Sequence, residues 1–131
     1  MIRMKITHIA ILARDIELLK DFYCRWFGAT AGPRYHNPRR DFTSYFLTFP
    51  DGDARLEIMN EPGITDAAAS GKLRGFSHIA ISAGSEEAVD ELTERMRLEG
   101  IPILGNPRTT GDGYYESIIA DPEGNLVEIT V

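Results

Sequence analysis

The sequence predicts an α+β protein built from two tandem β-α-β-β-β modules. Three observations support this fold class. The stretch THIAI at residues 7–11 is nearly repeated as SHIAI at residues 77–81. Each stretch is followed by the same order of expected elements, one helix and then three strands. Polar residues inside the expected strands recur at matching positions in the two halves, which is typical of an internal duplication.

The first half begins with a strand and a helix. Residues 5–13 alternate in side-chain type as a β-strand does. Asp15 stands at the N-cap of a helix expected over residues 16–27, where apolar residues recur at helical spacing. Gly28 follows as the C-terminal stop. Three further strands are expected over 29–36, 41–49 and 54–60, with a PDG turn between the last two.

The second half repeats this order after a small, polar and Gly-rich connector, which we expect to hold one short helical turn. A strand is expected over 76–82, and Ser85 caps a helix over 86–99 that ends at Gly100. Three strands follow, over 101–107, 113–121 and 125–131. We therefore predict a single domain over residues 1–131, with module one at about 4–60, the connector at 61–75 and module two at 76–131.

The composition narrows the classes of partner and compartment. The net charge of −6 argues against a nucleic-acid partner, because phosphate-binding faces usually carry a basic excess. No apolar run reaches the roughly 20 residues of a membrane helix, so we expect no membrane partner. His8 interrupts the apolar start, which favours a first strand over a signal peptide. The single cysteine, Cys24, cannot form an internal disulfide and is expected to be a packing residue, so the predicted localisation is cytoplasmic.

Each half offers one histidine and one glutamate at equivalent positions. His8 and His78 are 70 residues apart, and Glu57 and Glu128 are 71 apart. On each final strand the apolar neighbours face one side of the sheet and the glutamate faces the other. A carboxylate or an imidazole in such an apolar strand is costly to bury without a partner. We therefore expect the four side chains to converge on one concave face.

Two imidazoles and two carboxylates on one face form a metal site. The mixed nitrogen and oxygen set suits zinc, nickel or cobalt, with iron or manganese as alternatives. We predict one divalent metal per site, with two positions left open for water or substrate. Taken singly, a strand histidine is more often a surface or core residue, and a strand glutamate is usually solvated. The repeated pairing is what favours ligation by His8, Glu57, His78 and Glu128.

The doubled pattern, with HIAI near the start of each half and DPEGNLVEI at residues 121–129, resembles the vicinal oxygen chelate superfamily. The resemblance covers essentially the whole chain. It implies a half-open barrel around a metal site, whose ligands match the four residues named above. A complete His/Glu/His/Glu set is similar to that of the glyoxalase I-like (lactoylglutathione lyase-like) branch. The resemblance also implies a homodimer, with each metal site either within one chain or shared between two.

The resemblance implies a lyase or isomerase that transfers a proton on a small vicinal-oxygen substrate, such as a methylglyoxal hemithioacetal. Glu128 is the expected base, with Glu57 as its counterpart. Two departures leave the thiol carrier open. Leu12 stands where bacterial glyoxalase I-like proteins carry an arginine, and Asn60 lies three residues after Glu57 rather than four. The alternatives are a metal-dependent epimerase or dioxygenase of the same superfamily, or a non-catalytic protein that binds a small molecule such as an antibiotic.

Four further residues are predicted to line the substrate pocket: Arg55, Met59, Arg108 and Tyr115. The first two share the strand face of Glu57. Arg108 belongs to a Gly-rich segment that forms either a flap over the metal or a plain hairpin connection. Tyr114 and Tyr115 are adjacent, so only one of them can point inward.

Overall fold

The computed structural model describes residues 1–66 and 72–131. The chain divides into two compact units, Met1–Ala67 and Ala68–Val131, which are described separately. Residues 67–71 of the predicted connector, where the short helical turn was expected, lie outside the described residues. No helix in the described ranges combines the length and apolar character needed to cross a membrane.

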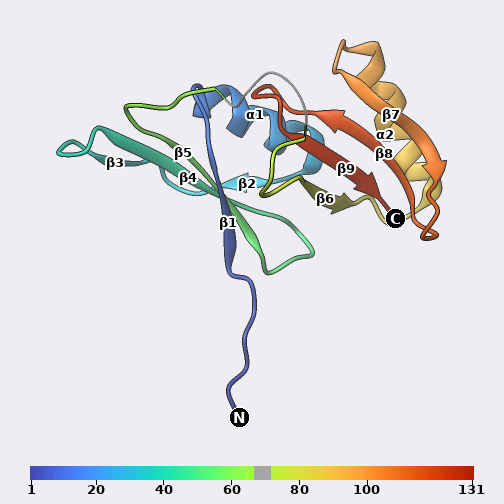
Figure 1. Ribbon diagram of the computed structural model, residues 1–131, viewed down its shortest axis with the longest axis horizontal. Coiled ribbons are helices and arrows are strands. Elements are labelled where there is room, and N and C mark those ends of the chain that lie inside the picture. Colours follow the sequence, from blue (N-terminus) through green and yellow to red (C-terminus); the bar gives the residue numbers. More distant parts are fainter. Residues whose placement is uncertain (67–71) are drawn as a thin grey trace. The chain divides into compact units, whose positions relative to one another are not determined.

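The first unit is one sheet with one helix (Figure 1). The sheet has the strand order β1-β5-β4-β2, and β3 also pairs with β4. Strands β1 and β5 run parallel, and the other pairs are antiparallel. In chain order the elements are β1 (His8–Leu12), α1 (Ile16–Phe27), β2 (Thr30–Ala31), β3 (Tyr35–Asn37), β4 (Phe42–Thr48) and β5 (Arg55–Asn60).

The second unit repeats this arrangement, with the strand order β6-β9-β8-β7 and a parallel β6–β9 pair. Its elements are β6 (His78–Ser82), α2 (Glu86–Leu98), β7 (Ile103–Thr109), β8 (Tyr115–Ala120) and β9 (Leu126–Thr130). The predicted α+β class and the two repeated modules are therefore confirmed. The predicted caps are also present: Asp15 accepts a hydrogen bond from the Leu18 amide, and Ser85 accepts one from the Ala88 amide.

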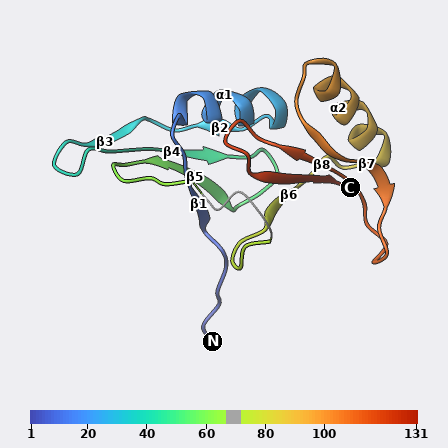
Figure 2. The same cartoon turned by 45° about the horizontal axis from the view of Figure 1, so that its top comes forward.

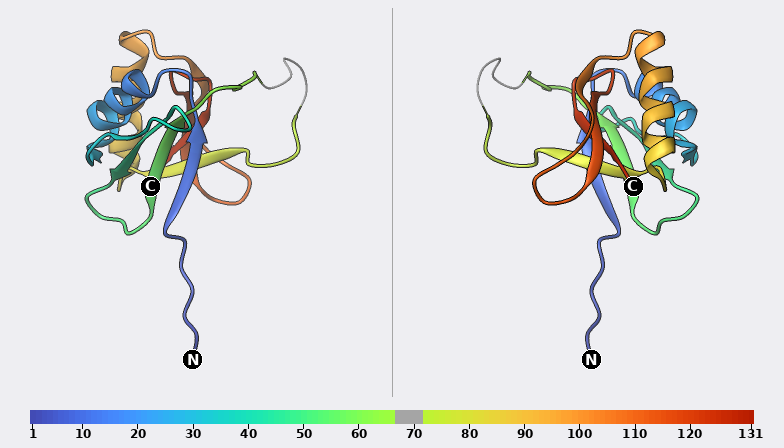
Figure 3. Two further views of the ribbon diagram at one scale, coloured as in Figure 1. Left: turned by 90° about the vertical axis from the view of Figure 1, so that its left-hand side faces the viewer. Right: turned by 90° about the vertical axis from the view of Figure 1, so that its right-hand side faces the viewer.

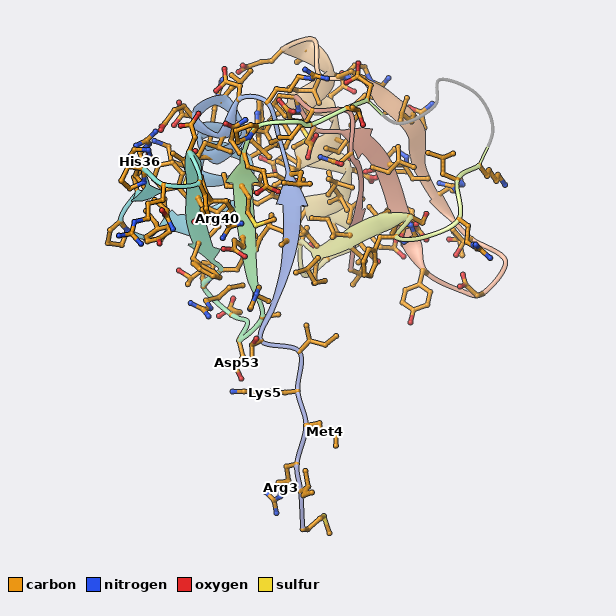
Figure 4. The ribbon with its side chains drawn as sticks, turned by 60° about the vertical axis from the view of Figure 1, so that its left-hand side comes forward. Arg3, Met4, Lys5, His36, Arg40 and Asp53 are labelled. Carbon is orange, nitrogen blue, oxygen red and sulfur yellow. The ribbon has the colours of Figure 1, made fainter. Side chains whose placement is uncertain are left out.

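The strand predicted over 29–36 is instead two short strands. Gly32 still donates its amide to the Phe46 carbonyl at 2.9 Å. Pro33 has no amide hydrogen to continue the ladder, so pairing with β4 stops and resumes at Tyr35. The first strand also begins later than predicted, at His8. Figure 4 shows Arg3, Met4 and Lys5 on an extended segment that leads away from the first unit.

Each helix covers one face of its own sheet. Figure 2 shows α1 along the sheet of the first unit, and Figure 3 shows α2 beside the sheet of the second. In the first unit, the Tyr45 hydroxyl on β4 donates to Glu17 of α1 at 2.8 Å. In the second unit, Ser117 on β8 and Thr93 of α2 share a buried hydrogen bond of 2.7 Å. Ile58 and Ile129, the register partners of Tyr45 and Ser117, are fully buried on these same faces. A functional site can therefore form on the opposite face of each sheet, which its own helix does not cover.

Candidate functional site

The strand register places one histidine and one glutamate on the same face of each sheet. In the parallel β1–β5 pair, Ala10 lies opposite Glu57, and in the parallel β6–β9 pair, Ala80 lies opposite Glu128. Each histidine comes two residues before that alanine and therefore shares its face. Because Ile58 and its equivalent in the second unit point toward the helices, the glutamates point away from them.

The two histidine–glutamate pairs are in close contact. His8 Nε2 lies 3.8 Å from Glu57 Oε1, and His78 Nε2 lies 3.1 Å from Glu128 Oε1. The imidazoles are more exposed than the carboxylates, at 39% and 38% against 16% and 22% of the side-chain surface. Each pair thus presents a nitrogen and an oxygen side by side, with the imidazole as the more exposed partner.

The second ring nitrogen of each histidine also has a partner. His8 Nδ1 lies 3.0 Å from the Thr7 hydroxyl, and His78 Nδ1 lies 3.0 Å from the Ser77 hydroxyl. Sequence reasoning missed both hydroxyls as site residues, although each repeat shows a hydroxyl residue directly before its histidine. In each ring Nδ1 thus faces the preceding hydroxyl, while Nε2 faces the paired glutamate.

Aromatic and cationic side chains surround the pair in the first unit. The Phe46 ring stands edge-on to the His8 ring at 5.3 Å, and the Arg55 guanidinium lies 4.3 Å from the Phe46 centroid. Phe46 is the register partner of Glu57, and Arg55 is that of His8, so all four share one face. Met59 is half-buried on the same face. The structure therefore brings the predicted pocket residues Arg55 and Met59 to the His8–Glu57 pair.

A buried carboxyl lies near the His78–Glu128 pair in the second unit. Glu116 on β8 is 7% exposed, and its Oε2 atom has no hydrogen-bond partner in the described part of the chain. Burial raises the pKa of this carboxyl, and a hydrogen bond with Glu128 raises it further. Sequence reasoning missed Glu116, although a glutamate between strand residues was the signal that singled out Glu57.

Arg108 also reaches the Glu128 face. One guanidinium nitrogen lies 3.2 Å from where a Cβ atom would stand at Gly105, so the missing side chain at that position makes room for it. Gly105 is paired with Ile118, and Ile118 is paired with Glu128. Arg108 is close enough to oppose the rise in the Glu116 pKa. The fourth predicted pocket residue, Tyr115, does not lie on this face.

Tyr115 points toward the helix instead. Its hydroxyl donates to Asp90 of α2, and this bond raises the pKa of Tyr115 to about 12. Tyr115 alternates with Glu116 along β8 and shares the face of Ser117. The structure therefore does not bring Tyr115 to the Glu128 face.

Two sequence features near the site have structural roles. The Asn60 side-chain amide donates to the Ala13 carbonyl at 2.9 Å, which ties the end of β5 to the chain leaving β1. The Asp121 carboxylate accepts from the Glu123 amide and from the backbone and side-chain amides of Asn125. This Asx-type turn sets the β8–β9 hairpin and thereby the position of Glu128.

The donor atoms of both pairs fit a divalent cation in chemistry, and those of the second pair also fit it in spacing. Two ligand atoms bound cis to one ion at about 2.1 Å lie roughly 3.0–3.4 Å apart. The His78–Glu128 contact of 3.1 Å matches this spacing, and the His8–Glu57 contact of 3.8 Å is slightly wider. Among residues 1–66 and 72–131, no group of three or more His, Cys, Asp or Glu side chains is arranged to hold a metal. Each unit by itself thus offers two donors.

Comparison with known proteins identifies relatives over the whole chain. The sequence profile of the Glyoxalase/Bleomycin resistance protein/Dioxygenase superfamily matches residues 5–129. Among curated proteins, the chain is 28% identical to the uncharacterized protein YwkD of Bacillus subtilis (strain 168) over 130 residues, which cover 98% of each protein.

Solved structures show the same fold. A glyoxalase family protein from Enterococcus faecalis superposes with a TM-score of 0.79 at 23% identity, covering 97% of both chains. The trypanothione-dependent glyoxalase I of Leishmania major superposes with a TM-score of 0.75 at 23% identity, covering 98% of this chain and 86% of that one. At these identities the likeness is one of fold.

Proposed function

Since the chain belongs to the Glyoxalase/Bleomycin resistance protein/Dioxygenase superfamily, we propose that it is a glyoxalase-like lyase or isomerase that uses one divalent metal. Its substrate would be a small molecule with vicinal oxygens, such as a methylglyoxal hemithioacetal. The observation that carries this proposal is the repeated pair, in which an imidazole Nε2 faces a glutamate Oε1 at 3.8 Å and at 3.1 Å.

The four side chains of the two pairs are proposed to hold the metal: His8, Glu57, His78 and Glu128. A bound divalent ion, with zinc, nickel or cobalt favoured by this donor set, would act as a Lewis acid toward the substrate oxygens. The two modules would then function as one domain over residues 1–131, because neither pair completes a four-ligand set alone. The ligands come together within one chain or between the chains of a homodimer.

Proton transfer is assigned to the glutamates. Glu128 is the proposed base, because a carboxylate beside the reacting carbon can take a proton from one position and return it to the next. Glu57 is its counterpart in the first module. Arg55, Met59 and Arg108 lie on the same faces as the pairs and are proposed to bind the rest of the substrate. Leu12, at the end of β1, is exposed and stands where an arginine would be expected to bind glutathione. The proposal therefore does not specify which thiol carries the substrate.

The test combines metal analysis with an isomerisation assay. Purified full-length protein is analysed for bound metal, stripped with a chelator, reloaded with zinc, nickel or cobalt, and assayed on hemithioacetals of methylglyoxal with several thiols. We expect one divalent ion per four-ligand site and activity that returns only on reloading. Protein that binds none of these metals would overturn the proposal, and a metal-free protein that still binds aromatic small molecules would favour a binding protein.

Compartment and assembly belong to the same proposal. We place the protein in the cytoplasm, since its one cysteine, Cys24, is half-buried in α1 as a free thiol and needs no oxidising compartment. We propose a homodimer, which light scattering of the purified protein would test directly. A strictly monomeric protein with full activity would contradict the homodimer and a metal site shared between two chains.

A further inference from the structure

Both histidines of the proposed site make the same contact with the residue directly before them. The Thr7 hydroxyl lies 3.0 Å from His8 Nδ1, and the Ser77 hydroxyl lies 3.0 Å from His78 Nδ1. The third histidine, His36 on β3, is exposed and has no contact of this kind in the described residues. The hydroxyl contact thus occurs at the two histidines that face a glutamate.

The contact decides which ring nitrogen faces the glutamate. An imidazole can rotate about its Cβ–Cγ bond, and a flipped ring would turn Nε2 away from the carboxylate. A hydrogen bond at Nδ1 holds the ring in the observed orientation. In the first unit the backbone that carries this hydroxyl is held in place, because the Thr7 carbonyl accepts a hydrogen bond from the Arg55 amide at 2.9 Å.

A hydroxyl can serve both protonation patterns of the ring. When Nε2 carries the hydrogen and donates it to a carboxylate, Nδ1 has a lone pair and accepts from the hydroxyl. When the Nε2 lone pair is used for a cation, Nδ1 carries the hydrogen and donates it to the hydroxyl oxygen. A backbone carbonyl could serve only the second pattern, because it cannot donate.

We propose that Thr7 and Ser77 are positioning residues of the metal site, whose hydroxyls hold Nε2 of His8 and His78 toward Glu57 and Glu128. This inference rests on the proposed function for the metal, but the ring orientation it describes exists without one. Both hydroxyl residues are exposed, so their removal creates no core cavity.

The first experiment measures metal affinity. Thr7→Val and Ser77→Ala remove the hydroxyls, while Thr7→Ser and Ser77→Thr retain them. Zinc alone is titrated calorimetrically into the metal-free full-length protein. Loss of an outer-shell partner of a ligating histidine typically weakens binding about 10–100-fold. We expect weakening by about 10-fold in each deletion and affinity near wild type in each conservative variant.

The control is Thr48→Val, on an exposed threonine of β4 whose hydroxyl contacts only the Thr30 carbonyl in the described residues. It should bind zinc like the wild type. Wild-type affinity in both Thr7→Val and Ser77→Ala would overturn the proposal. Equal weakening in Thr7→Val and Thr7→Ser would also overturn it, because the hydroxyl would then not be the cause.

The second experiment observes the rings in the metal-free protein by ¹⁵N-detected histidine NMR. It is run at a fixed pH of about 8, where ordinary imidazoles are mostly neutral. We expect Thr7→Val to shift only the His8 Nδ1 resonance and Ser77→Ala only that of His78, with His36 as the internal reference. Unchanged Nδ1 resonances in both variants would overturn the positioning role. If the wild type binds no zinc yet these shifts occur, the proposed metal function fails while the positioning role stands.

Discussion

The two modules contain the same histidine–glutamate pair, but the residues around the pair differ. In both, a histidine two residues before a paired alanine faces a glutamate on the neighbouring parallel strand. In the first module the strand beyond the glutamate contributes Phe46, with Arg55 stacked on its ring. In the second, it contributes Ile118, and two residues away lies the buried carboxyl of Glu116, whose pKa Glu128 helps to raise.

This difference shows where the duplication is strict and where it is not. The register that brings histidine and glutamate together is the same in both modules, and a shift of either strand by one residue would turn its side chain to the helix face and separate the pair. The equivalent of Glu116 in the first module is Ser44, which lies opposite Met59. Glu128 therefore has an acidic neighbour that Glu57 lacks, and the two glutamates are chemically unequal even though their backbones match.

The largest expected effect compares the two glutamates directly. Glu128→Gln should lower kcat on a hemithioacetal about 10²–10⁴-fold, the usual contribution of a general base. Glu57→Gln should lower it less, because in the proposal Glu57 mainly holds the metal. The measurement is kcat per bound metal ion, with Glu94→Gln on the outer surface of α2 as the control. Equal losses at Glu57 and Glu128 would show that the modules contribute equally to proton transfer.

The next effect concerns the stability of the two sheets. Ile58 and Ile129 occupy equivalent positions, and both are fully buried against their helices. Truncation of such a residue to alanine typically lowers the free energy of unfolding by about 2–5 kcal/mol. We expect Ile58→Ala and Ile129→Ala to fall in this range in urea denaturation. A large effect in one module with little change in the other would show that the modules differ in packing as well as in chemistry.

A smaller effect is expected where polar bonds tie helix to sheet. Tyr45 and Ser117 are equivalent, yet Tyr45 reaches the half-exposed Glu17 whereas Ser117 bonds the buried Thr93. Ser117→Ala should lower the free energy of unfolding by about 1 kcal/mol, the typical net value of one hydrogen bond. The loss is limited because Thr93 also donates to the Val89 carbonyl at 2.6 Å. Thermal denaturation would measure it, and a loss as large as that of Ile129→Ala would contradict this account.

The sequence predicts much of this architecture because the relevant signals are local. Alternation along the final strands placed Glu57 and Glu128 opposite their apolar neighbours, and helical spacing with a capping residue gave α1 its observed limits. The division at Pro33 also has a local signal, the missing amide hydrogen of proline, which the prediction of one strand over 29–36 does not take into account.

Other features depend on which strands pair and in which register, and a single sequence does not contain that information. The direction of Tyr115 follows from the pairing of Ile118 with Glu128, which fixes the neighbouring side chains of β8. The contact of Arg108 with the same face depends on the irregular β7–β8 register around Gly105. The Thr7 and Ser77 contacts depend on side-chain rotamers, which local alternation does not specify.

The last prediction concerns Glu116, the residue that makes the modules unequal. Burial first, and then the bond with Glu128, raises its pKa in the folded protein above the ordinary value of 4.5. The folded state therefore holds this proton to a higher pH than the unfolded state does. Stability is unaffected well below pH 4.5, falls as the pH rises through the raised pKa, and stays lower above it.

Glu116→Gln removes this ionisation while keeping the size of the side chain and a group that can donate to Glu128. The variant should match the wild type in Tm near pH 4 and exceed it at pH 7–8. At the higher pH the wild type must either hold a proton that the unfolded chain has released or carry a buried charge beside another carboxylate, and the variant has neither cost. Tm is measured across this range for both proteins, with the exposed Glu94→Gln as a control that should show no such divergence. A variant less stable than the wild type at pH 7 would contradict this prediction, because the ionised Glu116 carboxylate would then have a stabilising partner. The two modules would in that case be more alike in their electrostatics than the burial of Glu116 indicates.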